Sequence, residues 1–406
     1  MNKQKLVMVG NGMAGVRTLE ELLKLAPDLY DITVFSAEPH PNYNRIMLSP
    51  VLAGEQTLDD IILNPLQWYA DRGITLHLGR KVVEVDRQRR IVRADDGTEA
   101  PYDRLLMATG SNPFILPVPG KELDGVIAYR DIADTEYMIE TARQHRHAVV
   151  IGGGLLGLEA AYGLRQRGME VTVVHIAPWL LERQLDQKAA GLLQSTLEGH
   201  GLRFRIGAQT QELVDNGQGR VCAVRFKDGT EAAADLVVMA AGVRPNVGLA
   251  QQTGLHCERG IVVTDTLQTV TDPRVYAVGE CAAHRGIAYG LVAPLFDQAK
   301  VCATHLAQFG IGRYTGSQIS TKLKVTGVQL FSAGNFMGGE GTEEIVLDDP
   351  QAGVYKKLVL AGEQLVGACL YGDTDDGSWY FQLIQDGAKV GAMRDRLIFG
   401  QALACA

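Results

Sequence analysis

Two glycine fingerprints of the form G-x-G-x-x-G constrain this chain more than any other feature. They are Gly10-Asn11-Gly12-Met13-Ala14-Gly15 and Gly152-Gly153-Gly154-Leu155-Leu156-Gly157. Each follows a short apolar run and precedes a helical pattern, as in the strand-to-helix turn of a dinucleotide-binding fold. There the first glycine permits the tight turn, the second lets the backbone approach a pyrophosphate, and the third lets the helix pack on the strand. The duplication predicts two nucleotides held face to face, whereas either copy alone could be a glycine-rich turn without a ligand.

Length and charge exclude several classes of protein. A chain of 406 residues suffices for two or three domains, since domains commonly contain about 100–200 residues. The net charge of −8, without a segment rich in Lys and Arg, argues against a nucleic-acid partner. No apolar run reaches the roughly 20 residues that span a bilayer. Met1 to Lys5 leave no room for a leader before the strand Leu6 to Val9, so we expect a cytoplasmic protein without a membrane partner.

The first half of the chain carries further features of a nucleotide fold. A helical pattern runs to about Lys24, and the strand Asp31 to Phe35 follows it. Glu38 comes about 28 residues past the first glycine, where a carboxylate fits the ribose hydroxyls of an adenosine; a solvated loop acid is the alternative. A later apolar strand ends in Ala108-Thr109-Gly110, where small residues let the chain pass close to a dinucleotide.

The second half repeats this order of elements. Strands at Ala148 to Ile151 and Val171 to Val174 enclose the second fingerprint, and a later apolar strand ends in Ala240-Ala241-Gly242. Each half also contains a β-rich stretch with a hairpin signal, at Asp96-Gly97 and at Asp228-Gly229. We therefore interpret the two halves as an internal repeat.

Four landmarks then occur in a characteristic order. They are the first fingerprint, Ala108-Thr109-Gly110, the second fingerprint followed by Glu159, and Tyr276 to Glu280. In this order they resemble the two-dinucleotide flavoprotein superfamily over essentially the whole chain. The resemblance implies an α/β fold with FAD in a first Rossmann-like domain, a nicotinamide cofactor in a second, and a C-terminal mixed α/β interface domain.

Two further segments narrow the resemblance. Asn42-Tyr43-Asn44-Arg45-Ile46-Met47-Leu48-Ser49 and Ser320-Thr321-Lys322-Leu323-Lys324-Val325-Thr326-Gly327-Val328 are similar to the flavin domain of NADH-dependent assimilatory nitrite reductase and to the electron-transfer subunit of assimilatory nitrate reductase. Complete nitrite reductases of this kind continue into iron–sulfur and sirohaem modules, which this chain lacks. Its size suits the separate subunit that feeds electrons to a molybdenum nitrate reductase, although a piece of a longer nitrite reductase would look the same.

The resemblance implies roles for residues at matching positions. Arg45 and Ser49 correspond to residues that meet the FAD pyrophosphate, and a surface ion pair is the alternative for Arg45. Glu280 stands where an aspartate usually binds the ribityl chain, and Pro50 stands where many flavin reductases have a lysine near the flavin N5. A helix with Pro294 at its first position is expected to point its N-terminus at the flavin pyrimidine edge.

The choice of nicotinamide cofactor depends on the end of a single strand. An acid there selects NADH through the ribose hydroxyls, whereas arginines receive the 2′-phosphate of NADPH. This chain has His175, which as neutral imidazole suits a hydroxyl and as imidazolium tolerates a phosphate. With Glu182 and Arg183 nearby, NADH is favoured and NADPH remains possible. Glu159 is expected beside the nicotinamide, where it would orient the ring.

The cysteines provide neither a metal site nor a redox disulfide. They are scattered without C-x-x-C or metal-ligand spacing, and we expect most of them to be small buried hydrophobes. The segment Tyr43 to Pro50 contains none, so electrons must leave the flavin for an acceptor outside the chain. The six residues are Cys222, Cys257, Cys281, Cys302, Cys369 and Cys405.

The predicted domain order is an FAD domain in two segments, 1–112 and 241–312, around a nicotinamide domain, 113–240, with an interface domain at 313–406. In the last domain we predict strands at Leu323 to Leu330 and Lys356 to Leu360 and a helix around Trp379 to Gln385. Aromatic side chains there are interpreted as core, with a docking face as the alternative. They are Tyr371, Trp379, Tyr380 and Phe381.

The sequence thus predicts an FAD enzyme that takes hydride from NADH and passes electrons to a protein partner, namely the catalytic subunit of a molybdenum nitrate reductase. A nitrite reductase flavin domain, a rubredoxin or ferredoxin reductase, and a non-catalytic nucleotide sensor are the alternatives. Glu159 is the one residue placed at the reaction itself. The residues expected to bind the cofactors are Gly10, Gly12, Met13, Ala14, Gly15, Glu38, Arg45, Ser49, Val83, Ala108, Thr109, Gly110, Gly152, Gly154, Leu155, Leu156, Gly157, His175, Gly242, Gly279, Glu280, Pro294 and Leu295.

Overall fold

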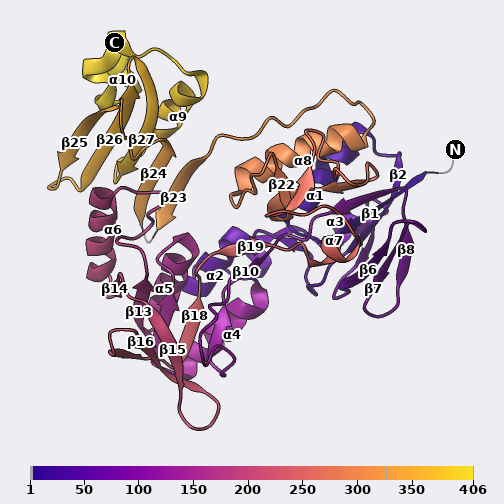
Figure 1. The fold of residues 1–406 in the computed structure, drawn as a ribbon, viewed down its shortest axis with the longest axis horizontal. Helices are drawn as coiled ribbons and strands as arrows, with labels where there is room; N and C mark the ends of the chain where they lie inside the picture. The colour runs from indigo at the N-terminus through magenta and orange to yellow at the C-terminus, as the bar shows by residue number, and fades with distance from the viewer. Residues whose placement is uncertain (1–2, 326, 406) are drawn as a thin grey trace. The chain divides into compact units, whose positions relative to one another are not determined.

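The apolar runs that flank the two fingerprints form two five-stranded parallel sheets (Figure 1). In the computed structural model, which describes residues 3–325 and 327–405, each sheet belongs to a different unit of the chain. Met1 and Thr326, from two of the segments named above, lie outside the described residues. Unit 1 comprises Met1–Leu48, Gln56–Asn112 and Val243–Ser317; unit 2 comprises Ser49–Glu55, Pro113–Gly242 and Gln318–Ala406.

The sheet of unit 1 has the strand order β21-β9-β1-β2-β5. Helix α1 (Met13–Leu25) buries Val16, Leu19 and Leu22, whose spacing places them on one face, in the same core as the strands. Helix α8 (Val292–Leu306) packs against α1. The strands are β1 (Gln4–Val9), β2 (Tyr30–Phe35), β5 (Thr75–His77), β9 (Arg104–Met107) and β21 (Val275–Ala277).

Shorter elements complete unit 1. The predicted hairpin at Asp96-Gly97 joins two strands of a three-stranded antiparallel sheet, β6-β7-β8, and Gly97 has a φ of +87°. The remaining elements are β3 (Asn42–Tyr43), η1 (Arg45–Met47), η2 (Asp59–Ile61), β4 (Ile62–Asn64), α3 (Leu66–Ala70), β6 (Val82–Asp86), β7 (Ile91–Ala94), β8 (Glu99–Pro101), α7 (Gly248–Gln252), β20 (Ile261–Val263), η3 (Gly279–Cys281) and β22 (Ala282–His284).

The first sheet of unit 2 has the order β11-β18-β12-β13-β14. Its strands are β11 (Val126–Ala128), β12 (His147–Ile151), β13 (Glu170–His175), β14 (Arg203–Ile206) and β18 (Leu236–Met239). The predicted hairpin at Asp228-Gly229 joins β16 to β17. The other elements of this part are α2 (Leu48–Ala53), α4 (Ile132–Gln144), α5 (Leu155–Gln166), α6 (Gln187–Gly199), β15 (Thr210–Asp215), β16 (Val221–Phe226) and β17 (Glu231–Ala233). Strands β10 (Ser111–Pro113) and β19 (Val243–Pro245) lie where the chain passes between the units.

The two parallel sheets have equivalent strand orders, which confirms the internal repeat. β1, β2, β5 and β9 correspond to β12, β13, β14 and β18, and in both sheets the fingerprint follows the central strand. Only the fifth strand differs in origin, because β21 comes late in the chain whereas β11 precedes its own fingerprint. The predicted α/β fold class is therefore confirmed, and the four-segment domain division stays a prediction.

The C-terminal part of unit 2 is an antiparallel sheet of order β23-β24-β27-β26-β25. The predicted continuous strand at Leu323 to Leu330 is wrong, because β23 pairs back on β24 with Val325 opposite Val328. Gly327, with a φ of +87°, sits between the two strands and was the available turn signal. The elements are β23 (Ser320–Val325), β24 (Val328–Gly334), β25 (Glu343–Asp349), β26 (Val354–Ala361), β27 (Gln364–Tyr371), α9 (Gly377–Asp386), η4 (Gly391–Phe399) and α10 (Gln401–Ala404).

The aromatic residues of this part belong to its core, as interpreted from the sequence. Tyr380 is fully buried and Tyr371 is nearly so, while Trp379 and Phe381 pack against the same cluster as Leu358. The predicted helix around Trp379 to Gln385 and strand at Lys356 to Leu360 are both present. These side chains therefore stabilise the sheet rather than form an exposed docking face.

One buried carboxylate connects this sheet to the nucleotide fold of unit 2. Asp186 caps α6 by accepting a hydrogen bond from the backbone of Ala189 at 2.9 Å. Its Oδ2 also accepts a hydrogen bond from the Tyr355 hydroxyl at 2.7 Å and lies 3.8 Å from Lys357 Nζ. Lys357 is itself buried and pairs with Glu344 at 2.7 Å, so its charge is compensated from two sides.

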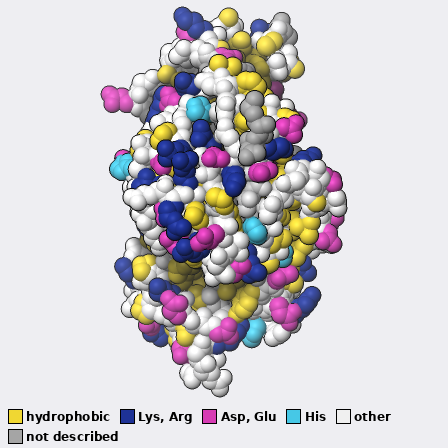
Figure 2. Space-filling view, turned by 90° about the vertical axis from the view of Figure 1, so that its right-hand side faces the viewer, with side chains coloured by type: hydrophobic (Ala, Val, Ile, Leu, Met, Phe, Trp, Pro, Cys, Tyr) yellow, Lys and Arg dark blue, Asp and Glu magenta, His cyan; other side chains and the backbone are white. Residues whose placement is uncertain are grey.

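Surface charges are mixed rather than segregated. Figure 2 shows Lys and Arg side chains interspersed with Asp and Glu side chains on the face that it draws. Exposed charges pair in the structure, as Arg93 does with Glu84 and Glu99, but solvent screens such exposed pairs. In the described part of the chain, every helix is too short or too polar to reach across a bilayer.

Because the C-terminal sheet is held by its core, shortening a buried side chain should destabilise it. Leu358→Ala, at a fully buried position of β26, should lower the free energy of unfolding by about 2–5 kcal/mol. Val346→Ala on β25 is the matched control, since half of that side chain is exposed, and should cost under about 1 kcal/mol. Urea unfolding followed by tryptophan fluorescence, in a background where Trp68 and Trp179 are replaced by Phe so that Trp379 is the remaining fluorophore, would measure both. Equal losses would contradict this description of the core.

Candidate functional sites

The first fingerprint is shaped by its contact with the neighbouring strand. Gly10 has a φ of +101°, and a Cβ built on it would lie 2.1 Å from the carbonyl oxygen of Ala108. A Cβ on Gly15 would lie 2.8 Å from the Ala108 side chain, whereas one on Gly12 would meet nothing within 4 Å. The first and third glycines are therefore required by packing, and the second leaves open space at the start of α1.

The second fingerprint has the same geometry. A Cβ on Gly152 would lie 2.2 Å from the carbonyl oxygen of Ala240, and one on Gly157 would lie 1.9 Å from that of Gly152. A Cβ on Gly154, at the start of α5, would again meet nothing within 4 Å. Ala240 thus plays in unit 2 the part that Ala108 plays in unit 1.

The two helices that follow the fingerprints begin without a side-chain cap. Gly12 and Gly154 are the N-caps of α1 and α5, and neither helix start receives a side-chain hydrogen bond. By contrast, Asp131 and Asp186 cap α4 and α6 through their carboxylates. The uncapped first-turn N–H groups, next to open space, fit an anionic pyrophosphate.

Unit 1 gathers its predicted residues at the carboxyl ends of its parallel strands. Ala108, Thr109 and Gly110 follow β9, and Gly279 follows β21, where a Cβ would come within 3.0 Å of Ala14. Glu280 accepts a hydrogen bond from the Ser111 hydroxyl at 2.7 Å. Ligands of open α/β sheets bind outside these strand ends, so the arrangement suits a dinucleotide.

Glu38 and Arg45 are joined to each other in unit 1. Arg45 Nη2 donates to Glu38 Oε1 at 2.6 Å, and the Tyr43 hydroxyl donates to Oε2 at 2.7 Å. Burial opposes ionisation of Glu38, but Arg45 and Tyr43 outweigh it and hold the pKa of the carboxyl below its usual value. The sequence does not predict a role for Tyr43, and the structure identifies it as a partner of this carboxylate.

A polar cluster that the sequence did not predict supports the first fingerprint. The Tyr69 hydroxyl donates to Asn11 Oδ1 at 2.9 Å, and Asn42 Nδ2 donates to the Asn11 carbonyl oxygen at 2.9 Å. Asn11 Nδ2 is buried without a hydrogen-bond partner in the described structure. Because leaving a buried donor unpaired costs about 1–3 kcal/mol, a bound acceptor beside the fingerprint would stabilise this arrangement.

Helix α8 begins earlier than predicted. It starts at Val292, so Pro294 is its third residue rather than its first. The prediction failed because a proline is tolerated throughout the first turn, where no N–H is needed within the helix. Leu295 is buried beside it, whereas the predicted cofactor residue Val83 lies half exposed on β6.

Unit 2 brings Ser49 and Glu159 together. The Ser49 hydroxyl donates to Glu159 Oε2 at 2.7 Å, and the buried Tyr129 hydroxyl lies 3.3 Å from Ser49 Oγ. Burial raises the pKa of Glu159, and the hydrogen bond from Ser49 only partly offsets this. Ser49, expected at the FAD pyrophosphate, therefore has a carboxylate partner on α5.

His175 ends β13 and is buried beneath the second fingerprint. Its Nδ1 accepts a hydrogen bond from the Gly153 backbone at 3.1 Å, and its Nε2 lies 3.1 Å from Glu182 Oε2. Both ring nitrogens thus have protein partners. At the end of β18, Gly242 is exposed with a φ of +111°.

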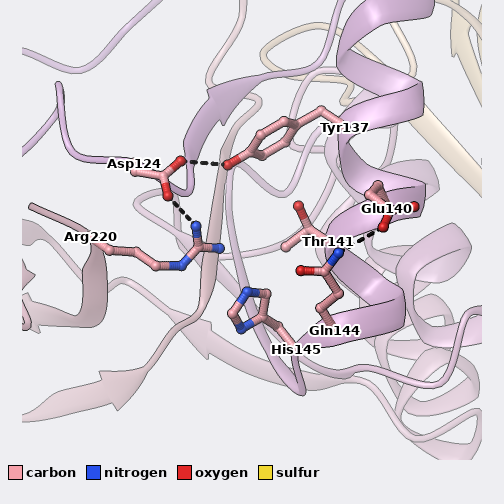
Figure 3. Close-up of a pocket in the computed structure, with 7 residues that line it drawn as sticks. All are labelled: Asp124, Tyr137, Glu140, Thr141, Gln144, His145 and Arg220. Atoms are coloured by element: carbon pink, nitrogen blue, oxygen red, sulfur yellow. Dashed lines mark hydrogen bonds and ion pairs between the residues drawn. The ribbon is translucent and has the colours of Figure 1, made fainter.

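A separate pocket of about 200 Å³ lies beside α4 in unit 2 (Figure 3). Asp124 there accepts from the Tyr137 hydroxyl and pairs with Arg220, and Glu140 accepts from Gln144. Because its charged groups pair with one another, we assign it no ligand. The lining is completed by Thr141 and His145.

The cysteines are less uniformly buried than predicted. Cys281, Cys302 and Cys369 are buried, as expected for small hydrophobes, and burial raises the pKa of each thiol. Cys257 is partly exposed, and Cys222 and Cys405 are exposed. The prediction that most are buried therefore holds for only three, because two lie on a sheet face and at the chain end.

Comparison with known families matches both parts of the chain. Residues 4–305 match the family described as pyridine nucleotide-disulphide oxidoreductase. Residues 320–388 match the rubredoxin NAD+ reductase C-terminal domain.

Two relatives come from Bacillus subtilis (strain 168). A nitrite reductase [NAD(P)H] is 53% identical over 390 residues, which are 96% of this chain and 48% of that protein. An assimilatory nitrate reductase electron transfer subunit is 48% identical over 376 residues, which are 93% of this chain and 48% of that protein. The chain spans about half the length of each, so the prediction that its size suits the separate subunit is wrong.

Solved structures share the fold over almost the whole chain. A ferredoxin reductase from Rhodopseudomonas palustris has a TM-score of 0.86 at 26% identity, with 95% of this chain and 96% of that chain covered. An NADH:rubredoxin oxidoreductase from Clostridium acetobutylicum has a TM-score of 0.78 at 22% identity, with 96% and 97% covered.

The fingerprint geometry predicts opposite outcomes for two similar substitutions. Gly157→Ala should lower the free energy of unfolding by about 1–3 kcal/mol or more, because the new methyl group would overlap the Gly152 carbonyl. Gly154→Ala should cost under about 1 kcal/mol, since its φ of −82° suits any residue and the space is open. Chemical unfolding without added nucleotide would compare them. A larger loss in Gly154→Ala would contradict the assigned packing roles.

The raised pKa of Glu159 predicts a pH-dependent stability. Burial favours the protonated carboxyl, so ionisation destabilises the fold as the pH rises above the ordinary value of 4.5. Glu159→Gln removes this penalty and should raise the melting temperature relative to the parent protein more at pH 7.5 than at pH 4. Calorimetry at the two pH values tests this, with the exposed Glu140→Gln as a control. A gain that is larger at pH 4 would reverse the sign of the effect and overturn it.

Proposed function

Because the chain belongs to the pyridine nucleotide-disulphide oxidoreductase family, it is an NAD(P)H-dependent oxidoreductase that uses FAD, and we propose that it passes electrons from NADH to a separate redox centre of nitrate or nitrite assimilation. The observation that carries the proposal is the duplicated uncapped helix start, at Gly12 and Gly154. Two such starts on equivalent sheets suit two pyrophosphates. A cytoplasmic location is part of this proposal.

Within unit 1, the side chains suit the parts of FAD. The α1 N-terminus and Arg45 would hold the pyrophosphate, and Glu38 would accept from the adenosine ribose in place of Tyr43 or Arg45. Glu280, next to Ser111, would face the ribityl chain, and the start of α8 would face the pyrimidine edge. When bound, FAD supplies a group that accepts hydride and gives up electrons one at a time.

Within unit 2, the α5 N-terminus would hold the pyrophosphate of NADH. Glu159 would orient the nicotinamide, with Ser49 fixing its carboxyl group at 2.7 Å. Pro50 stands where many flavin reductases have a lysine near the flavin N5, so position 50 would supply no ammonium there. The contribution of the protein is positioning, because hydride transfer needs no general acid or base.

Three acceptors are supported by different comparisons. We propose the molybdenum nitrate reductase catalytic subunit, which the Bacillus electron transfer subunit supports at 48% identity. The iron–sulfur and sirohaem centre of a nitrite reductase is the second candidate, supported by the nitrite reductase at 53% identity. The match of residues 320–388 supports a rubredoxin-type carrier as a third possibility.

We expect the purified protein to be yellow and its flavin to be bleached by NADH. With NADH alone it should reduce ferricyanide but neither nitrate nor nitrite, since the described residues contain no cluster of His, Cys, Asp and Glu that could hold a metal. Adding the nitrate reductase catalytic subunit should give NADH-dependent nitrate reduction. A protein that binds both nucleotides without bleaching would be a sensor, contrary to the proposal.

Parallel reactions with a sirohaem nitrite reductase module and with rubredoxin separate the acceptors. Rapid reduction of either one, with nitrate reductase inactive, would overturn the proposed pairing and leave the flavin chemistry intact.

A further inference from the structure

The hydrogen bonds of His175 fix which ring nitrogen carries the proton. The Gly153 backbone N–H can only donate, so Nδ1 accepts at 3.1 Å and the proton of the neutral ring lies on Nε2. Nε2–H then donates to Glu182 Oε2 at 3.1 Å. The histidine therefore holds a carboxylate at the end of β13.

The loop after β13 is built to bring Glu182 to this place. Leu181 precedes it with a φ of +53°, a left-handed conformation that costs an ordinary residue roughly 1–2 kcal/mol. Leu181 is fully buried, and its N–H donates to the Gly153 carbonyl oxygen at 3.1 Å. A Cβ on Gly153 would lie 2.7 Å from His175 Cγ. The loop and the histidine therefore both pack directly against the second fingerprint.

The carboxylate held in this way is accessible. About a third of the Glu182 side chain is exposed, whereas only 8% of the His175 side chain is. The other oxygen, Oε1, lies 4.0 Å from Nε of Arg183, whose side chain is 81% exposed and free to move away. One carboxylate oxygen is thus fixed by the histidine and the other is available to a ligand.

The second strand of a dinucleotide fold ends beside the adenosine ribose, where an acid commonly binds the hydroxyls. In this chain His175 occupies the strand end. We propose that Glu182 determines cofactor choice, accepting hydrogen bonds from the ribose hydroxyls of NADH and repelling the 2′-phosphate of NADPH, and that His175 is its positioning residue. This inference rests on the proposed function, since it presumes that unit 2 binds the nicotinamide cofactor.

Binding of ADP-ribose and of 2′-phospho-ADP-ribose tests the inference without involving the flavin reaction. Calorimetric titration of the holoprotein should show tighter binding of ADP-ribose. Glu182→Gln should reduce this preference roughly tenfold, mainly by improving the binding of the phosphorylated ligand. Glu140→Gln, which makes the same charge change on α4, is the matched control and should leave the preference within about twofold.

The positioning role is tested by two substitutions of the histidine. His175→Phe keeps a ring but removes the donor, and should reduce the preference about as much as Glu182→Gln does. Combining the two changes should produce no further reduction, because both remove the same interaction. His175→Gln, which can still donate to the carboxylate, should retain part of the preference. Independent, additive effects would overturn the positioning role.

Two outcomes separate this inference from the proposed function. If the parent protein binds ADP-ribose and Glu182→Gln leaves the ratio of dissociation constants unchanged, the cofactor site stands and the assignment of Glu182 is overturned. If the parent protein binds neither ligand, the nicotinamide site of the proposed function is contradicted, and the inference falls with it.

Discussion

The close approach between each glycine turn and the next strand governs the rest of the structure. In both copies an alanine, Ala108 or Ala240, lies so near the turn that the first glycine cannot carry a side chain. Through this contact the strand, the turn and the helix pack closely together. The helix therefore starts at the carboxyl ends of the parallel strands. A capping side chain would satisfy the same N–H groups that a pyrophosphate needs, and having glycine at the N-cap instead costs each helix roughly a few tenths of a kcal/mol. The fold is thus less stable at the two places where it is suited to bind anions.

The two copies diverge where their ligands would diverge. At the second position of the fingerprint, Asn11 joins a cluster with Tyr69, whereas Gly153 makes room for His175. Past the second strand, unit 1 presents Glu38 directly, while unit 2 reaches its carboxylate through a histidine and a loop. The repeat therefore keeps the turn that suits a pyrophosphate and varies the groups that would meet the ribose.

Much of the fold could be predicted from the sequence because it depends on local signals. Apolar runs predicted the inner strands of both parallel sheets, and Asp-Gly pairs predicted the hairpins, whereas the edge strands β5, β11 and β14 were not predicted. The break between β23 and β24 was missed because residues typical of strands continue up to Gly327, the only turn signal. The start of α8 was misplaced because Pro294 is compatible with several positions in a first turn.

The candidate sites could be predicted only in part, since contacts between distant segments set their chemistry. The packing roles of the first and third glycine of each fingerprint could be predicted, because those roles follow from spacing. The pairing of Ser49 with Glu159 joins residues far apart in the chain, which spacing alone does not reveal. The contact of His175 with Glu182 depends on the left-handed backbone conformation of Leu181, which cannot be predicted from a leucine in the sequence.

The contacts of Asp186 with both α6 and β26 affect how these two elements of unit 2 would unfold locally. The same carboxylate caps α6, accepts a hydrogen bond from the Tyr355 hydroxyl and faces Lys357, so moving either element away would leave this buried carboxylate with fewer partners. We therefore expect the first turn of α6 and the middle of β26 to open together, so that their amide protons exchange in one common fluctuation rather than by separate fraying. The nucleotide fold and the C-terminal sheet of unit 2 have separate cores, and Asp186 would couple their opening.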